Sequence, residues 1–160
     1  MIWLYCLAAV VSWVLWNVIH EMSHVMAANL VGNVKSWKIK PYPHKYNGKF
    51  RFAGAYWIWD GPSPAKEAQG LISLAPRLSN FVAIELAFLT FLLSGTAKMF
   101  LLIFCAAGVI DLIVGSIGYS DGSDLRKAAD KLEVNPWRIR AIGLAISAIG
   151  IIIIIASTLH

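Results

Sequence analysis

The clearest chemical signal in this sequence is a pair of histidines four residues apart, with a glutamate directly after the first. They are His20, Glu21 and His24, in the stretch IHEMSHVMAA. Residues four apart lie on one face of a helix, so both imidazoles can be directed at one metal ion. Glu21 is rotated by about 100° from His20 and can reach a water molecule on that ion. The spacing therefore predicts a zinc ion with two imidazole ligands and a carboxylate base beside it.

The chain around this motif has the composition of a membrane protein. Of its 160 residues, 58% are hydrophobic and 14% are charged. Soluble domains are usually about half apolar and about a quarter charged. Four apolar stretches, residues 2–31, 71–93, 99–119 and 139–159, reach the ~20 residues that cross a bilayer. The sequence thus predicts one domain over residues 1–160, an α-helical polytopic membrane protein with four transmembrane helices.

The lysines and arginines predict how these helices are oriented. They cluster in the loops 32–70 and 120–138, and the positive-inside rule places such loops in the cytoplasm. Both termini are then expected on the outer side. A net charge of +5 is also compatible with nucleic acid binding, but basic clusters between apolar runs are typical of membrane protein loops. We therefore expect the lipid bilayer as a partner, and no nucleic acid.

The first basic loop has the pattern of a β-hairpin. In the segments VKSWKIK and KFRF, apolar residues alternate with basic ones, which is the period of a strand. Asn47 and Gly48 lie between the two segments and are a strong turn signal. Trp57 and Trp59 follow, with rings suited to a membrane interface. We predict a membrane-associated β-hairpin within residues 34–59; the alternative is an irregular basic loop.

Catalytic zinc usually has a third protein ligand, and the acidic candidates are Glu85, Asp111, Asp121 and Asp124. Glu85 lies past the middle of the second apolar stretch, which is too far from the histidines. At ~1.5 Å per helical residue, counting from the outer ends matches the histidines with Asp121, and counting from the cytoplasmic charges matches them with Asp111. Both remain candidates. The structural alternative is a polar patch between helices, packed against Glu85 or Asp111.

These motifs resemble those of the site-2-protease family of intramembrane zinc metalloproteases, over nearly the whole chain. The resemblance is carried by HEMSH followed by the small residues of VMAANLVG, and by the basic, β-rich segment after it. In LISLAPRLSNFV, Ala75, Pro76 and Asn80 match the family's Ala-Gly-Pro…Asn helix, without its glycine. The segment SDG resembles the Leu-Asp-Gly element that supplies the third zinc ligand, which favours Asp121 over Asp111. The family's Asn-x-x-Pro ahead of that aspartate is missing here.

The resemblance implies a small, minimal-core member of this family. Such a protein is a zinc-dependent endopeptidase that hydrolyses peptide bonds of membrane-embedded or membrane-bound substrates. His20, His24 and Asp121 are then expected to bind Zn²⁺, with Glu21 as the catalytic base and later acid. Asn80 is expected to bind the substrate backbone or stabilise the oxyanion, unless it only makes an interhelical hydrogen bond. The edge of the hairpin is expected to hold an extended substrate by strand addition.

Two other functions are compatible with the residues. The first is a non-proteolytic membrane binding or assembly subunit that retains the protease fold, which the missing Asn-x-x-Pro allows. The second is an ion pathway or transporter that uses His20, Glu21, Glu85 and Asp111. Four apolar stretches without inverted repeats are unfavourable for a transporter.

Overall fold

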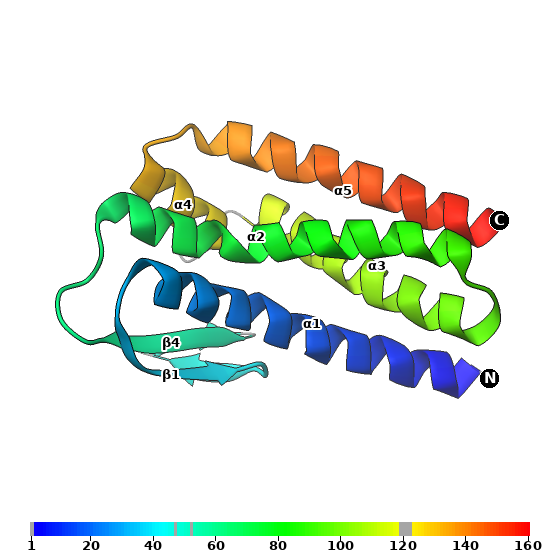
Figure 1. The fold of residues 1–160 in the computed structure, drawn as a ribbon, viewed down its shortest axis with the longest axis horizontal. Coiled ribbons are helices and arrows are strands. Elements are labelled where there is room, and N and C mark those ends of the chain that lie inside the picture. Colours follow the sequence, from blue (N-terminus) through cyan, green and yellow to red (C-terminus); the bar gives the residue numbers. More distant parts are fainter. Residues whose placement is uncertain (1, 47, 52, 119–122) are drawn as a thin grey trace.

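The computed structural model describes residues 2–46, 48–51, 53–118 and 123–160. In this part of the chain, four long helices run lengthwise, and paired strands and a short helix cover one end (Figure 1). Both termini lie at the opposite end of the bundle. The helices are α1 (Ile2–Val31), α2 (Lys66–Leu89), α3 (Gly95–Ile117), α4 (Asp124–Leu132) and α5 (Pro136–Leu159), with a single 3₁₀ turn at Thr90–Leu92 after α2.

All four long helices are long and apolar enough to cross a membrane, and they coincide with the four predicted stretches. The candidate spans are Ile2–Val31, Lys66–Leu92, Gly95–Ile117 and Pro136–Leu159. The last three begin three to five residues before the predicted starts, because the first turn of each helix need not be apolar. At Pro136, for example, the Asn135 side chain accepts a hydrogen bond from the Trp137 amide and caps the helix. The prediction of four long apolar helices is confirmed.

The basic segment after α1 forms two nested antiparallel pairs of strands. Strand β1 (Val34–Lys40) pairs with β4 (Gly54–Trp59), and β2 (His44–Tyr46) pairs with β3 (Lys49–Arg51). The predicted turn lies between β2 and β3, where Gly48 has a φ of 74°. The strand VKSWKIK therefore pairs with the later segment GAYWIW rather than with KFR. The prediction of a hairpin in this segment was correct. The turn signal, however, indicates only the pairing of the strands directly beside it, β2 and β3, and not the outer pairing of β1 with β4.

A short helix that the sequence analysis treated as loop lies between α3 and α5. The Ser123 side chain caps α4 by accepting a hydrogen bond from the Arg126 amide, and Glu133 ends the helix in the left-handed conformation. The buried residues of α4 are Leu125, Ala128 and Ala129. This amphipathic helix has only nine residues, so a search for apolar stretches of ~20 residues does not detect it.

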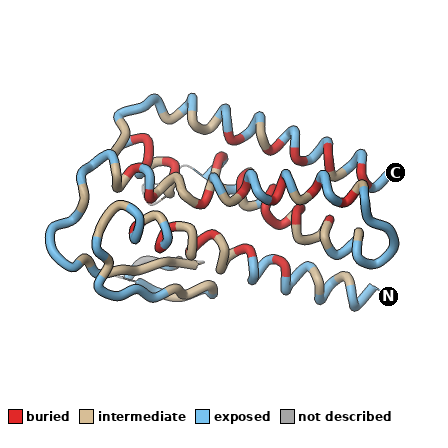
Figure 2. Tube along the Cα trace, in the orientation of Figure 1, coloured by how far each residue is buried: buried red, intermediate tan, exposed pale blue. Residues whose placement is uncertain are grey.

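Small residues allow the long helices to approach one another closely. Buried positions lie where helices face each other, and the outer faces are exposed (Figure 2). Gly108 on α3 is an example, because it lies against Ala83 of α2 and Trp16 of α1. Glycine and alanine at such contacts are typical of helices that associate in a membrane, where the outer faces need not be polar.

Replacing Gly108 with Ala is expected to lower the free energy of unfolding by about 1–3 kcal/mol, as overpacking does in other cores. A Cβ atom at this position would lie 2.7 Å from both the Cβ of Ala83 and a ring carbon of Trp16. Thermal unfolding in detergent micelles measures the effect. Val114→Ala, on an exposed position of the same helix, is the control. A melting temperature as high for Gly108→Ala as for that control would contradict this account of the packing.

Candidate metal centre

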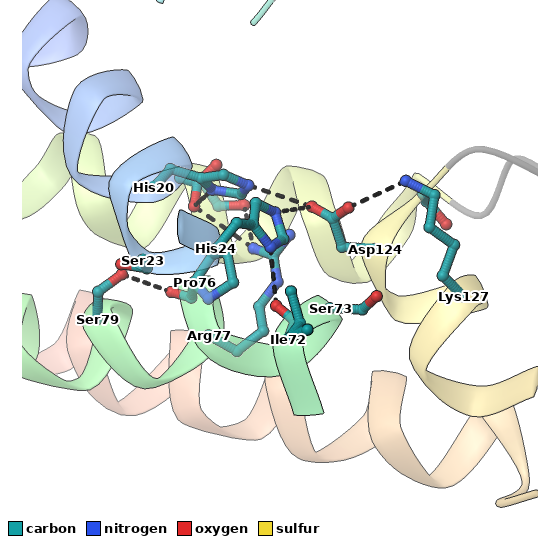
Figure 3. Close-up of polar contacts among 12 residues, drawn as sticks. His20, Ser23, His24, Ile72, Ser73, Pro76, Arg77, Ser79, Asp124 and Lys127 are labelled. Carbon is teal, nitrogen blue, oxygen red and sulfur yellow. Dashed lines mark hydrogen bonds and ion pairs between the residues drawn. The ribbon is translucent and has the colours of Figure 1, made fainter. Parts of the chain in front are cut away.

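The three residues of the opening motif lie together on the buried face of α1. His20, Glu21 and His24 are 9%, 7% and 7% exposed. Asp124, the first residue of α4, faces them from the other side (Figure 3). Its Oδ2 atom is 3.2 Å from Nε2 of His20 and 3.3 Å from Nε2 of His24. Ligand atoms of His20, His24 and Asp124 all lie within 4.8 Å of one another, so this group could hold a metal ion.

The donor set and its spacing fit zinc. Two imidazole nitrogens and a carboxylate oxygen form a common zinc ligand set, which leaves the fourth position for water or substrate. In a tetrahedral site with bonds of ~2.0–2.1 Å, two ligand atoms are about 3.3–3.4 Å apart. The two distances from Asp124 Oδ2 to the imidazoles, 3.2 and 3.3 Å, are close to this separation. Two of the three donor separations are therefore close to those of a tetrahedral site, and the ligand atoms of all three residues lie within 4.8 Å of one another.

The second nitrogen of each imidazole is held by another acceptor. Nδ1 of His20 lies 3.0 Å from Oδ2 of Asp111, and Nδ1 of His24 lies 2.8 Å from the carbonyl oxygen of Ile72. In the tautomer with hydrogen on Nδ1, both rings donate these bonds, and the lone pairs on Nε2 are available for a metal ion. Histidine ligands of metals are usually oriented in this way, by a carboxylate or a backbone carbonyl.

Asp111 is itself held by residues of α2. Asn80 donates to its Oδ2 at 3.1 Å and to the carbonyl of Gly108 at 2.9 Å. Arg77 donates to the Asp111 carbonyl oxygen at 3.2 Å, and its Nη1 lies 3.4 Å from Asp111 Oδ2. The guanidinium fits because position 115 is glycine; a Cβ atom there would lie 2.2 Å from an Arg77 nitrogen. A buried arginine thus balances the charge of Asp111.

Arg77 was not among the residues that the sequence analysis selected. The signal was present, since a cation inside an apolar stretch is costly unless it is paired. With a side chain only 11% exposed, Arg77 meets that condition through Asp111.

Two opposing effects act on Asp124. Burial alone would raise the pKa of its carboxyl group, but when the imidazoles are protonated on Nε2 the hydrogen bonds and charges of His20 and His24 hold that pKa well below its usual range. Its second oxygen, Oδ1, lies 3.5 Å from Nζ of Lys127. Asp124 is also in the first turn of α4, where the helix dipole favours an anion. The carboxylate form, which binds metals, is therefore the stable one.

The other predicted site residues lie in different places. Asp121, the favoured third ligand, lies outside the residues that the structure describes. Asp111, its alternative, contacts Nδ1 of His20, while Asp124 faces Nε2 of the same ring. Glu85 is exposed on α2 and is not part of the group. Asn80 is completely buried and makes the interhelical hydrogen bond that was its alternative role.

A cavity of about 540 Å³ leads to the group that could hold a metal ion. Glu21, His24 and Asp124 form part of its wall, so the carboxyl group of the predicted base faces the same space as two of the donors. Strand β4 forms another part, through Gly54, Ala55, Tyr56, Trp57 and Trp59. Residues of α2 and α4 complete it, among them Gln69, Ile72, Ser73, Lys127 and Lys131. The volume is in the range of small-molecule and peptide side-chain sites.

Asp111→Asn is expected to weaken zinc binding about 10–100-fold, as loss of a carboxylate that orients a ligating histidine does elsewhere. The amide can present its NH₂ group to Nδ1 of His20 and so disfavour the tautomer that leaves Nε2 for the metal. Competition with a fluorescent zinc chelator measures the affinity. Asp130→Asn, at an exposed position of α4, is the control. Equal affinities for the two variants would remove Asp111 from the site.

No protein-family model matches this chain, and comparison with curated proteins and solved structures finds no match. The resemblance to intramembrane metalloproteases therefore depends on the motifs in the sequence alone.

Proposed function

We propose that this chain is a zinc-dependent intramembrane endopeptidase, with His20, His24 and Asp124 as metal ligands and Glu21 as the catalytic base. One observation carries most of the proposal. The Nε2 atoms of both histidines converge on one oxygen of Asp124, at the wall of a cavity that Glu21 also lines. Since each Nδ1 already has its own acceptor, this geometry suits a metal ligand set better than a polar patch between helices.

The chemistry follows from the residues around that point. A zinc ion held by His20, His24 and Asp124 would lower the pKa of a bound water molecule to about 7 and would polarise the carbonyl of the scissile bond. Glu21 accepts the proton of the attacking water and returns it to the nitrogen of the leaving amine, so that the C–N bond breaks. Its position one residue after His20 on the same helix holds it beside the metal without making it a ligand.

The substrate is a membrane-embedded or membrane-bound peptide in an extended conformation. A helical peptide bond is shielded by its own helix, so the segment to be cut must first be unwound. Strand β4 pairs only with β1 among the described strands, and five of its residues line the cavity. Its second edge is suited to accept the substrate by strand addition, which holds the backbone extended beside Glu21.

The cavity is expected at the cytoplasmic boundary of the membrane. The strands and α4 carry most of the basic residues and lie together at one end of the bundle, and both termini lie at the other end (Figure 1). The positive-inside rule assigns the basic end to the cytoplasm. Water can reach such a site from the cytoplasm while the substrate remains in the bilayer.

The proposal is tested by reconstituting the purified protein in vesicles with a mixture of single-span peptides. The expected result is pairs of fragments whose masses add up to the intact peptide plus one water molecule, as identified by mass spectrometry. A protein that binds zinc and peptides but produces no such pairs would instead support the non-proteolytic binding subunit.

A further inference from the structure

We infer that the cavity selects peptides with an acidic side chain close to the cleaved bond. This inference rests on the proposed peptidase function and extends it to the class of substrate. It is argued from the charges of the cavity wall, with Glu21 and Asp124 counted as parts of the metal centre.

Cations enter the cavity wall from two sides. Arg51 of β3 lies on the strand side, and Lys127 and Lys131 of α4 lie on the helix side. Glu21 and Asp124 are the only carboxylates among the described lining residues. Both belong to the metal centre, as base and as ligand. The wall therefore has three cations and no carboxylate left to bind a basic substrate group.

Two of these cations have no carboxylate partner in the described part of the chain. Lys127 is engaged by Oδ1 of Asp124 at 3.5 Å. Arg51 and Lys131 form no ion pair with a carboxylate of the described residues, whereas cations of neighbouring elements do. Lys66 pairs with Glu133 at 2.6 Å, and Arg126 pairs with Asp130 at 3.4 Å. Of the cations without a carboxylate partner among the described residues, Arg51 and Lys131 are the two that line the cavity.

A carboxylate of the substrate is the group that matches this wall. Arginine binds carboxylates through two parallel N–H donors, and lysine adds a point charge. Charges that face a partly enclosed cavity are also screened less by water than charges on an open surface. A neutral side chain lacks these bonds, and a basic one is repelled by Arg51, Lys131 and the metal ion together.

A lipid phosphate is the other anion available at a membrane boundary. The acidic peptide is favoured because Arg51 and Lys131 line the same cavity as Glu21 and His24. A headgroup bound there would obstruct the metal centre.

The test measures binding of three membrane-anchored fluorescent peptides that differ only in a central Glu, Gln or Lys. The zinc-loaded Glu21→Gln protein in zwitterionic vesicles is used, so that the peptides stay intact. Fluorescence anisotropy is expected to show the Glu peptide binding about tenfold more tightly than the Gln peptide, with the Lys peptide weakest.

Variants of the cavity wall then test whether Arg51 and Lys131 cause the preference for the Glu peptide. Arg51→Glu combined with Lys131→Glu is expected to reverse the order of the Glu and Lys peptides. Arg51→Gln alone, a milder change, is expected to reduce the preference for Glu. Lys38→Glu is the matched control, because Lys38 is exposed on β1 and does not line the cavity. It should leave the order unchanged.

Equal binding of the three peptides would overturn the inference. It would also be overturned if Lys38→Glu abolished the preference for the Glu peptide as fully as the variants of the cavity wall do. Loss of the preference when anionic lipid is added would assign the cations to lipid phosphate and also overturn it. Cleavage by the wild type separates the two proposals. Selective binding without cleavage would contradict the peptidase function and support recognition of acidic peptides. Cleavage without selectivity would support the peptidase function and contradict recognition of acidic peptides.

Discussion

Glu21→Gln is expected to lower the rate of peptide hydrolysis by about 10²–10⁴-fold while bound zinc stays at the wild-type level. The amide has nearly the same shape as the carboxyl group but cannot accept the proton of the attacking water. The metal ligands are unchanged, because Glu21 faces the cavity and is not part of the group formed by His20, His24 and Asp124. Initial rates with a reconstituted peptide substrate and zinc content by mass spectrometry measure both quantities on one preparation.

Glu67→Gln is the matched control for this prediction. Glu67 is exposed in the first turn of α2 and does not line the cavity, so both its rate and its zinc content should equal those of the wild type. A Glu21→Gln protein that cleaves as fast as this control would remove Glu21 from the reaction. A Glu21→Gln protein without zinc would instead make Glu21 a ligand.

Asp124→Ala is expected to cause the largest loss of zinc among the acidic variants. The substitution removes the oxygen that both Nε2 atoms face, at 3.2 and 3.3 Å. Removal of a ligand should weaken zinc binding by more than the about 10–100-fold expected of a residue that only orients a ligand. Zinc content after dialysis measures the loss, and circular dichroism of the same sample checks that the helices remain.

The variants of the other two aspartates rank the candidates. Asp111→Ala is expected to retain more zinc than Asp124→Ala, since Asp111 contacts Nδ1 of His20. Asp121→Ala is expected to retain the most. If Asp121→Ala lost its zinc while Asp124→Ala kept a full complement, the third ligand would be Asp121, as the sequence predicted.

The grouping of His20 and His24 on α1 could be predicted, because their separation of four residues is close to one turn of a helix. His20 and His24 are four residues apart, and that spacing alone places them on one face. The four long helices were equally accessible, since each depends on an apolar run of its own. Neither prediction required knowledge of which helices are neighbours.

The position of Asp124 beside the histidines could not be predicted, because it depends on a short helix and not on one of the long apolar ones. The carboxyl group reaches the histidines only because α4 begins at this residue, with Ser123 as its cap. The counts of depth assumed that α3 or a loop supplied the ligand, and a helix of nine residues is too short to stand out in hydropathy. The recognisable signal was the serine cap before an amphipathic segment.

The same limit applies to the partners of the histidines. Asp111 was selected as a buried acid, but its contact with Nδ1 and its pairing with Arg77 depend on how α1, α2 and α3 meet. The outer strand pair is a similar case, because β1 and β4 are joined across an inner hairpin. Contacts between segments distant in the chain carry no local pattern from which they can be read.

The most direct test of the central claim is cleavage of a membrane peptide by the reconstituted protein after chelation and after stepwise return of zinc. The account predicts that chelation abolishes cleavage and that activity returns in proportion to zinc, up to about one ion per chain. Cleavage that continues undiminished in the metal-free protein would contradict it.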